Sequence, residues 1–274
     1  MQKVIDFYSK YPYPSKQINS IKNLYKNAEW ITSLIGFKPD SFPSNSKILE
    51  AGCGTGEFSC GFALSKNSEV IGIDISEKSL EIAEKNKKKF KLSTVSFQNA
   101  NVLSLPFESN SFDFVFSLGC VHHTENPRKA FKEIARVLKP NGFIVLGVYN
   151  KYGRLITRIK KSIADFLFFI YFNFNKANEN EKIELKINFI NSLFYSGKLT
   201  EHKRIWIADK YLHPHEHFHS ISELMNWFQE EKIEVINALP EFDFKGKSKF
   251  YWIKVQLNWL FKEKSFFIFA GKKH

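Results

Sequence analysis

The stretch Lys47-Ile-Leu-Glu-Ala-Gly-Cys-Gly-Thr-Gly-Glu-Phe58 decides the fold of this chain of 274 residues. A short apolar run ends in an acidic residue, glycine follows at every second position, and a helical pattern begins at Glu57. Gly52, Gly54 and Gly56 have no Cβ atom, so the backbone can turn sharply at positive φ and a ligand can approach the bare peptide groups. The stretch therefore predicts a strand, a tight turn and a helix N-terminus that together bind a cofactor.

The spacing of these glycines argues against the common phosphate-binding loops. Dinucleotide sites use G-x-G-x-x-G, and Walker loops end in Lys-Ser or Lys-Thr. Here the residue three past Gly56 is Ser59, and neither pair follows. A second apolar run, Val70–Asp74, ends in a carboxylate 22 residues past Gly52 (74 minus 52). A carboxylate at that place would accept hydrogen bonds from both hydroxyls of a ribose.

Two segments, Glu50–Gly56 and Gly72–Asp74, resemble the cofactor site of class I S-adenosylmethionine (SAM)-dependent methyltransferases. Four later stretches follow in the order and spacing of that family: Asn101–Phe107, Ser111–Ser117, Val121–Thr124 and Arg136–Gly142. The resemblance covers about residues 46 to 150 and rests on several independent motifs in register. It implies SAM as the cofactor and methyl transfer as the activity.

Strand and helix patterns alternate from Lys47 onward, which predicts an α/β fold with a parallel sheet and crossover helices. The expected strands are 47–49, 69–73, 94–98, 112–117, 143–148, 233–240 and 266–271, and the expected helices begin at 57, 76, 127 and 222. The resemblance implies a Rossmann-like open sheet of seven strands, mostly parallel, whose last strand is antiparallel and lies between two others.

The chain divides into four parts by this pattern. The expected parts are an N-terminal helical lid segment (1–45), a SAM-binding core (46–150), an inserted helical cap that forms the substrate region (151–220), and the remainder of the core with a small insertion (221–274). Insertions after the fifth strand and before the last lie at the carboxyl edge of the sheet, where open α/β sheets bind ligands. We therefore expect them to build the acceptor pocket.

The N-terminal segment 2–37 has a helical pattern that Tyr11-Pro-Tyr-Pro14 interrupts, because proline breaks a helix. Tyr11 and Tyr13 are candidates for covering the cofactor and contacting the acceptor. The alternative is an ordinary pair of helices packed on the sheet.

Charge and composition bound the function only loosely. The net charge of +12 admits an acidic partner. The densest basic run, Lys85–Lys91, falls at the end of an expected helix. There lysines interact favourably with the negative end of the helix dipole and face solvent. No RNA-binding motif accompanies this run. The three cysteines, Cys53, Cys60 and Cys120, lack metal or disulfide spacing, so we expect no metal.

We expect a cytoplasmic protein without a transmembrane span. Asp6 interrupts the stretch where a signal peptide needs a continuous apolar run. The apolar run Phe166–Phe172 is shorter than the roughly 20 residues that a span needs. It is either buried cap core, which we favour, or a helix at a lipid interface. The sequence makes no prediction about oligomeric state.

The resemblance implies which residues hold SAM. Glu50 would receive the ammonium group, Asp74 the ribose and Ile75 the adenine. Asn101 stands where the family usually has an aspartate that accepts from the adenine amino group, and its amide oxygen can still accept one bond. The full expected set is Glu50, Gly52, Cys53, Gly54, Asp74, Ile75, Asn101, Val102 and Ser117.

Candidates for the acceptor side follow the fourth and fifth strands. His123, chosen by resemblance, and His122 could contact the acceptor or take its proton, or else have a structural role. Arg154 would suit a carboxylate or phosphate on the acceptor. The other expected contacts are Tyr149, Asn150, His213, His215 and His217. The last three either line the pocket, bind a metal, which we disfavour, or stabilise a loop.

The sequence thus predicts a SAM-dependent methyltransferase acting on oxygen, nitrogen or carbon of a small molecule. An RNA methyltransferase and a lipid or quinone methyltransferase are alternatives within the class. A non-catalytic SAM-binding sensor is the alternative outside it.

Overall fold

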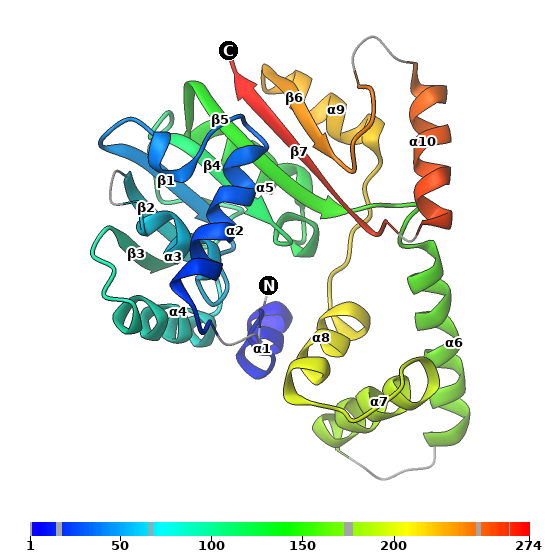
Figure 1. Cartoon of the computed structure of the whole chain (residues 1–274). Helices are drawn as coiled ribbons and strands as arrows, with labels where there is room; N and C mark the ends of the chain where they lie inside the picture. Colours follow the sequence, from blue (N-terminus) through cyan, green and yellow to red (C-terminus); the bar gives the residue numbers. More distant parts are fainter. Residues whose placement is uncertain (1, 15–17, 66–67, 173–177, 245–247, 263) are drawn as a thin grey trace.

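A computed structural model describes residues 2–14, 18–65, 68–172, 178–244, 248–262 and 264–274. Its centre is one sheet of seven strands in the order β3-β2-β1-β4-β5-β7-β6 (Figure 1). The strands are β1 (Ser46–Ala51), β2 (Ser68–Asp74), β3 (Val95–Asn99), β4 (Phe112–Leu118), β5 (Leu138–Tyr149), β6 (Ile233–Leu239) and β7 (Phe266–Lys273). β7 runs antiparallel to both β5 and β6, and the other pairs are parallel. The predicted fold class is confirmed.

Helices cover both faces of the sheet. The α-helices of the described chain are α1 (Gln2–Lys10), α2 (Ile21–Ser33), α3 (Glu57–Ala63), α4 (Glu77–Lys89), α5 (Pro127–Val137), α6 (Leu155–Phe172), α7 (Glu179–Phe194), α8 (Glu201–Leu212), α9 (Ile221–Glu230) and α10 (Lys249–Phe261). Apolar side chains of α5, α9 and α10 form one core with the sheet, and those of α2 and α3 form another on the opposite face.

The central strands are apolar on both faces because both faces are covered. In β1, Ile48 packs towards α2 and α3, whereas its neighbour Leu49 packs towards α5 and α9. In β4, Phe114 and Phe116 belong to the first of these cores and Val115 to the second. This alternation fixes the register, since a slip by one residue would exchange the two faces.

Helices α6, α7 and α8 form a separate lobe between β5 and α9, and α1 lies between this lobe and α4 (Figure 1). The core of the lobe contains Ala164, Ile187, Ile205 and Tyr211. Tyr11, from the segment after α1, is buried in the same core. The N-terminal segment is therefore packed into the inserted helices as well as the sheet domain.

Two features differ from expectation. The run Phe166–Phe172, expected as buried core, lies on α6, and there Phe166 is 63% and Phe169 60% exposed, because α6 turns a different face with Ala164 inward. Also, β5 already begins at Leu138, and its pairing with β4 shifts register between Phe112 and Phe114. No helix in the described ranges has the length and apolarity needed to cross a bilayer.

Candidate functional site

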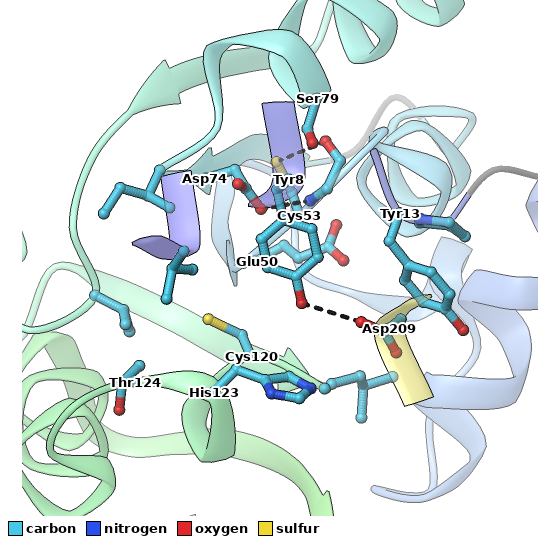
Figure 2. Close-up of a pocket in the computed structure, with 18 of the residues that line it drawn as sticks. Tyr8, Tyr13, Glu50, Cys53, Asp74, Ser79, Cys120, His123, Thr124 and Asp209 are labelled. Carbon is cyan, nitrogen blue, oxygen red and sulfur yellow. Dashed lines mark hydrogen bonds between the residues drawn. The ribbon is translucent and has the colours of Figure 1, made fainter. Parts of the chain in front are cut away.

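A cavity of about 600 Å³ opens at the carboxyl ends of β1, β2, β4 and β5. Its walls come from the glycine turn after β1, the ends of the neighbouring strands, the N-terminal segment and α8. Figure 2 shows side chains from these elements converging on it. Of the sequence-based candidates, it is lined by Tyr13, Glu50, Gly52, Cys53, Gly54, Asp74, Ile75, Asn101, Val102, His123, Tyr149 and Arg154.

The glycine turn has the conformation that the sequence requires. Gly52, Gly54 and Gly56 have φ values of 84°, 50° and 77°, which side chains disfavour. The N–H groups of Gly52 and Cys53 both donate to the Ile73 carbonyl at 2.8 Å. The turn is thereby fixed to the end of β2.

The N-terminal segment is seated directly on this turn. A Cβ atom on Gly54 would lie 2.2 Å from the carbonyl oxygen of Tyr13. The Thr55 hydroxyl donates to the Pro14 carbonyl at 3.0 Å. Glycine is needed at position 54 because another piece of backbone passes there, and that piece carries Tyr13 to the cavity wall.

Two carboxylates occupy the cofactor end of the cavity. Glu50 is 3% exposed and accepts hydrogen bonds from the backbone and hydroxyl of Ser59. Burial raises the pKa of Glu50 to about 8. Asp74 accepts from the N–H groups of Gly54 and Ser76 at 2.8 and 2.9 Å, and burial raises its pKa as well. Carboxyl groups in these surroundings favour a positively charged ligand.

The remaining cofactor candidates divide into two groups. Ile75, Val102 and Asn101 line the cavity beyond Asp74, and the Asn101 amide oxygen accepts from the Leu103 N–H at 3.0 Å. Ser117 does not line it, because its buried hydroxyl donates to the Ala51 carbonyl at 2.7 Å. Ser117 joins β4 to β1 beneath the site.

The two adjacent histidines have different surroundings. His123 reaches the cavity, and its Nδ1 lies 2.8 Å from the His215 carbonyl oxygen. That carbonyl can only accept, so Nδ1 carries the proton and Nε2 has the free lone pair. Burial lowers the pKa of His123 to about 3. His122 lies behind it, outside the lining, fully buried against the Tyr149 ring, and burial holds its pKa well below the usual value.

The histidine-rich segment His213–His219 packs against His123 on the side away from the cavity, and its histidines do not line the cavity. The His213 ring packs against the His123 ring at an angle of 39° with centroids 3.8 Å apart, and the His217 N–H donates to the His122 carbonyl at 2.9 Å. His215 contributes its carbonyl, as described above. The three expected substrate contacts are therefore placed in a packed loop, and no set of metal-ligating side chains occurs in the described part of the chain.

Tyr149 and Arg154 line the cavity where β5 ends. The Arg154 guanidinium lies 3.8 Å over the Tyr149 ring and pairs with Glu216, which Lys161 also contacts at 3.8 Å. Asn150 lies outside the lining, because its side-chain oxygen accepts two backbone N–H groups of the turn that follows. Tyr11 is also outside, since its hydroxyl donates to Glu184 in the lobe of inserted helices at 2.7 Å.

Sequence reasoning missed the residues that close the cavity from above. Tyr8 on α1 points into it, and its hydroxyl donates to Asp209 on α8 at 3.2 Å (Figure 2). Trp30, Cys120, Trp206 and Phe266 also line it. One sequence signal existed for Asp209: it lies four residues past Ile205, so an acidic residue falls on the same helix face as an apolar one. Burial raises the pKa of Asp209 to about 6.

Comparison with known proteins shows that the glycine turn and the strands around it belong to a segment that matches a known domain. A family model described as a methyltransferase domain matches residues 49–146. Phosphoethanolamine N-methyltransferase 2 of Caenorhabditis elegans is 29% identical over 200 residues, which is 68% of this chain and 43% of that protein. Demethylmenaquinone methyltransferase of Oceanobacillus iheyensis is 30% identical over 142 residues, which is 51% of this chain and 57% of that protein.

Solved structures share the fold at low sequence identity. PKMT2 from Rickettsia typhi, solved in complex with AdoHcy, has a TM-score of 0.63 and 18% identity, and the match covers 95% of this chain and 55% of that one. A SAM-dependent methyltransferase from Aquifex aeolicus has a TM-score of 0.52 and 14% identity, with 98% of both chains covered. The chain spans about half the length of the curated relatives described above.

Proposed function

We propose that this chain, which contains a methyltransferase domain with SAM as its cofactor, transfers the methyl group of SAM to a small molecule held beneath α1 and α8. The observation that carries the proposal is the continuity of the cavity. One space of about 600 Å³ joins the glycine turn and its two carboxylates to a chamber of aromatic side chains. Donor and acceptor can therefore meet without leaving the protein.

The residues at the cofactor end fit SAM. A sulfonium cation with an amino acid tail needs anionic groups and uncharged backbone groups. Glu50 is buried and Asp74 half-buried, and both carboxyl groups accept hydrogen bonds from backbone N–H groups. SAM supplies a methyl group that is already activated for displacement. The protein's task is then to align two ligands at near-attack distance.

Each residue of the cofactor end has a proposed task. Glu50 binds the ammonium group, Asp74 accepts from the ribose hydroxyls, and the methionyl part lies along the cavity wall to which Gly52 and Cys53 contribute. Ile75 and Val102 pack on the adenine. Asn101 is proposed to lie beside the adenine amino group, at the place where the family usually has an aspartate.

His123 is proposed to orient the acceptor through the lone pair of Nε2. With its pKa lowered to about 3, the ring stays neutral at physiological pH and accepts a hydrogen bond readily, but it holds a proton weakly. The packed His213 ring and the His215 carbonyl keep the His123 ring in place.

Methyl-labelled SAM incubated with a fractionated cell extract tests this function. We expect one labelled product, identified by mass, and stoichiometric formation of S-adenosylhomocysteine. A water-soluble product supports the small-molecule acceptor. A lipid-extractable product would favour the second candidate, a lipid or quinone methyltransferase, which the exposed Phe166 and Phe169 of α6 make plausible. Binding of SAM without any turnover would favour a sensor.

Donor binding should depend on pH through Glu50. In the free protein its pKa is raised to about 8, so the carboxyl group is protonated at neutral pH and must lose this proton to bind an ammonium group. Affinity for SAM should therefore rise by up to about tenfold per unit of pH below 8 and level off above it. Calorimetry in buffers of different ionisation enthalpy should detect proton release that Glu50→Gln abolishes. An affinity that is flat between pH 6 and 8 would contradict this assignment.

A further inference from the structure

Asp209 is a buried carboxylate that forms no close ion pair within the described residues, although the charge of Arg154 acts on it from a longer distance. It is 7% exposed, lines the cavity, and accepts the hydroxyl of Tyr8 at 3.2 Å. No ion pair to Asp209 occurs within 4.0 Å in those residues, whereas Arg154 on the same wall is paired with Glu216. A carboxylate in this state is costly to bury unless a ligand supplies the opposite charge.

The surfaces around Asp209 are mainly aromatic. Tyr8, Tyr13, Trp206, Tyr149 and Phe266 all contribute to the cavity. Aromatic faces attract cations through the quadrupole of the ring, most strongly when water is excluded. One carboxylate surrounded by rings is the environment that binds ammonium groups and their methylated forms.

We propose that the acceptor is an amine, which enters as an ammonium ion and pairs with Asp209, while Tyr8 orients the carboxylate through its hydroxyl. This rests on the proposed function and specifies its substrate class. Asp209 and the glycine turn line the same cavity, so the nitrogen would be held between Asp209 and the donor end. Figure 2 shows the Tyr8 hydroxyl directed to Asp209.

The reaction balances with Asp209 as the proton acceptor. The ammonium gives one proton to the carboxylate, which leaves a neutral amine with a lone pair. That lone pair forms the new nitrogen–carbon bond as the carbon–sulfur bond breaks and its electron pair stays on sulfur. The products are a methylated ammonium ion and a neutral thioether, and the proton on Asp209 passes to solvent.

A binding experiment separates charge recognition from shape. Protein saturated with S-adenosylhomocysteine is titrated with choline and with 3,3-dimethylbutan-1-ol, its uncharged isostere. We expect choline to bind at least about tenfold more tightly, and Asp209→Asn to remove most of this preference. Tyr8→Phe should reduce it less, since the ring remains. Asp165→Asn, which alters a carboxylate of α6 paired with Lys186 at 2.7 Å, is the matched control and should change nothing.

Equal binding of the two probes by the wild-type protein would overturn the proposal. So would a parallel loss of S-adenosylhomocysteine and SAM affinity in Asp209→Asn, because the carboxylate would then serve the sulfonium of the donor. A protein that binds neither donor nor product would instead refute the proposed function, which keeps the two failures apart.

A transfer experiment tests the same assignment on the reaction. Primary and secondary amines are offered in parallel with alcohols of the same carbon skeleton, and S-adenosylhomocysteine is measured. We expect turnover only with amines, and a decrease of about 100-fold or more in kcat/KM for Asp209→Asn with unchanged donor affinity. Methyl transfer to the alcohols at a comparable rate would contradict an amine acceptor.

Discussion

Gly54→Val should reduce the affinity for SAM by about 100-fold or more. The new Cβ would lie 2.2 Å from the carbonyl oxygen of Tyr13, and φ at this position is +50°, which a β-branched residue strongly disfavours. The turn must shift to relieve this overpacking and backbone strain, which cost on the order of 3 kcal/mol, and SAM binding must restore the strained turn. At about 1.4 kcal/mol for each tenfold in affinity, this cost corresponds to a loss of about 100-fold. Isothermal titration of the purified variant with SAM measures the loss.

Gly197→Val is the matched control for strain without a clash. Gly197 has a φ of 83°, and a Cβ atom there would have no neighbour within 4 Å. It should bind SAM like the wild-type protein, with only a lower melting temperature. If Gly54→Val retained full affinity while its circular dichroism stayed native, the glycine turn would not be the donor site.

Asp74→Ala should weaken SAM binding by about 1–3 kcal/mol, because charge-assisted hydrogen bonds to the ribose hydroxyls are lost. The same carboxylate holds the Gly54 N–H at 2.8 Å, so part of the loss comes from a less ordered turn. Asp74→Asn keeps the shape and should retain more affinity than alanine. Competition with adenosine, which has the ribose but no methionyl part, separates the loss of the ribose hydrogen bonds from the effect of a less ordered turn.

Asp113→Ala provides the comparison for Asp74. Asp113 also accepts a backbone N–H, that of Lys47 at 2.8 Å, but it lies near the start of β4, at the amino end of the parallel strands and outside the cavity lining. Its loss should lower stability and leave donor affinity intact. Equal dissociation constants for wild-type protein and Asp74→Ala would refute the ribose assignment.

The cofactor end could be predicted from the sequence because its determinants are local. Glycine spacing dictates the turn between β1 and α3, and an apolar run ending in aspartate dictates where β2 presents its carboxylate. The alternation of apolar runs likewise indicated the seven strands, since each central strand is buried on both faces. These features depend on neighbours along the chain.

The acceptor end depends on contacts between distant segments, which no local pattern records. Tyr8 meets Asp209 across 201 positions of sequence, and neither residue belongs to a motif. The clustered histidines attracted attention because of their spacing, yet His213 is packed behind His123 as a neutral ring. Phe166 was expected inside because it is apolar, but only one face of α6 is covered.

One short piece of chain contacts the glycine turn, α8 and the lobe of inserted helices. Between residues 8 and 14 it reaches Asp209 through Tyr8, Glu184 of α7 through Tyr11, and Gly54 and Thr55 through the backbone of Tyr13 and Pro14. We therefore expect binding of the donor at the glycine turn and binding of the acceptor beside Asp209 to depend on the same movement of this segment. We expect this enzyme to exchange its ligands in a fixed sequence, governed by how often its first helix detaches.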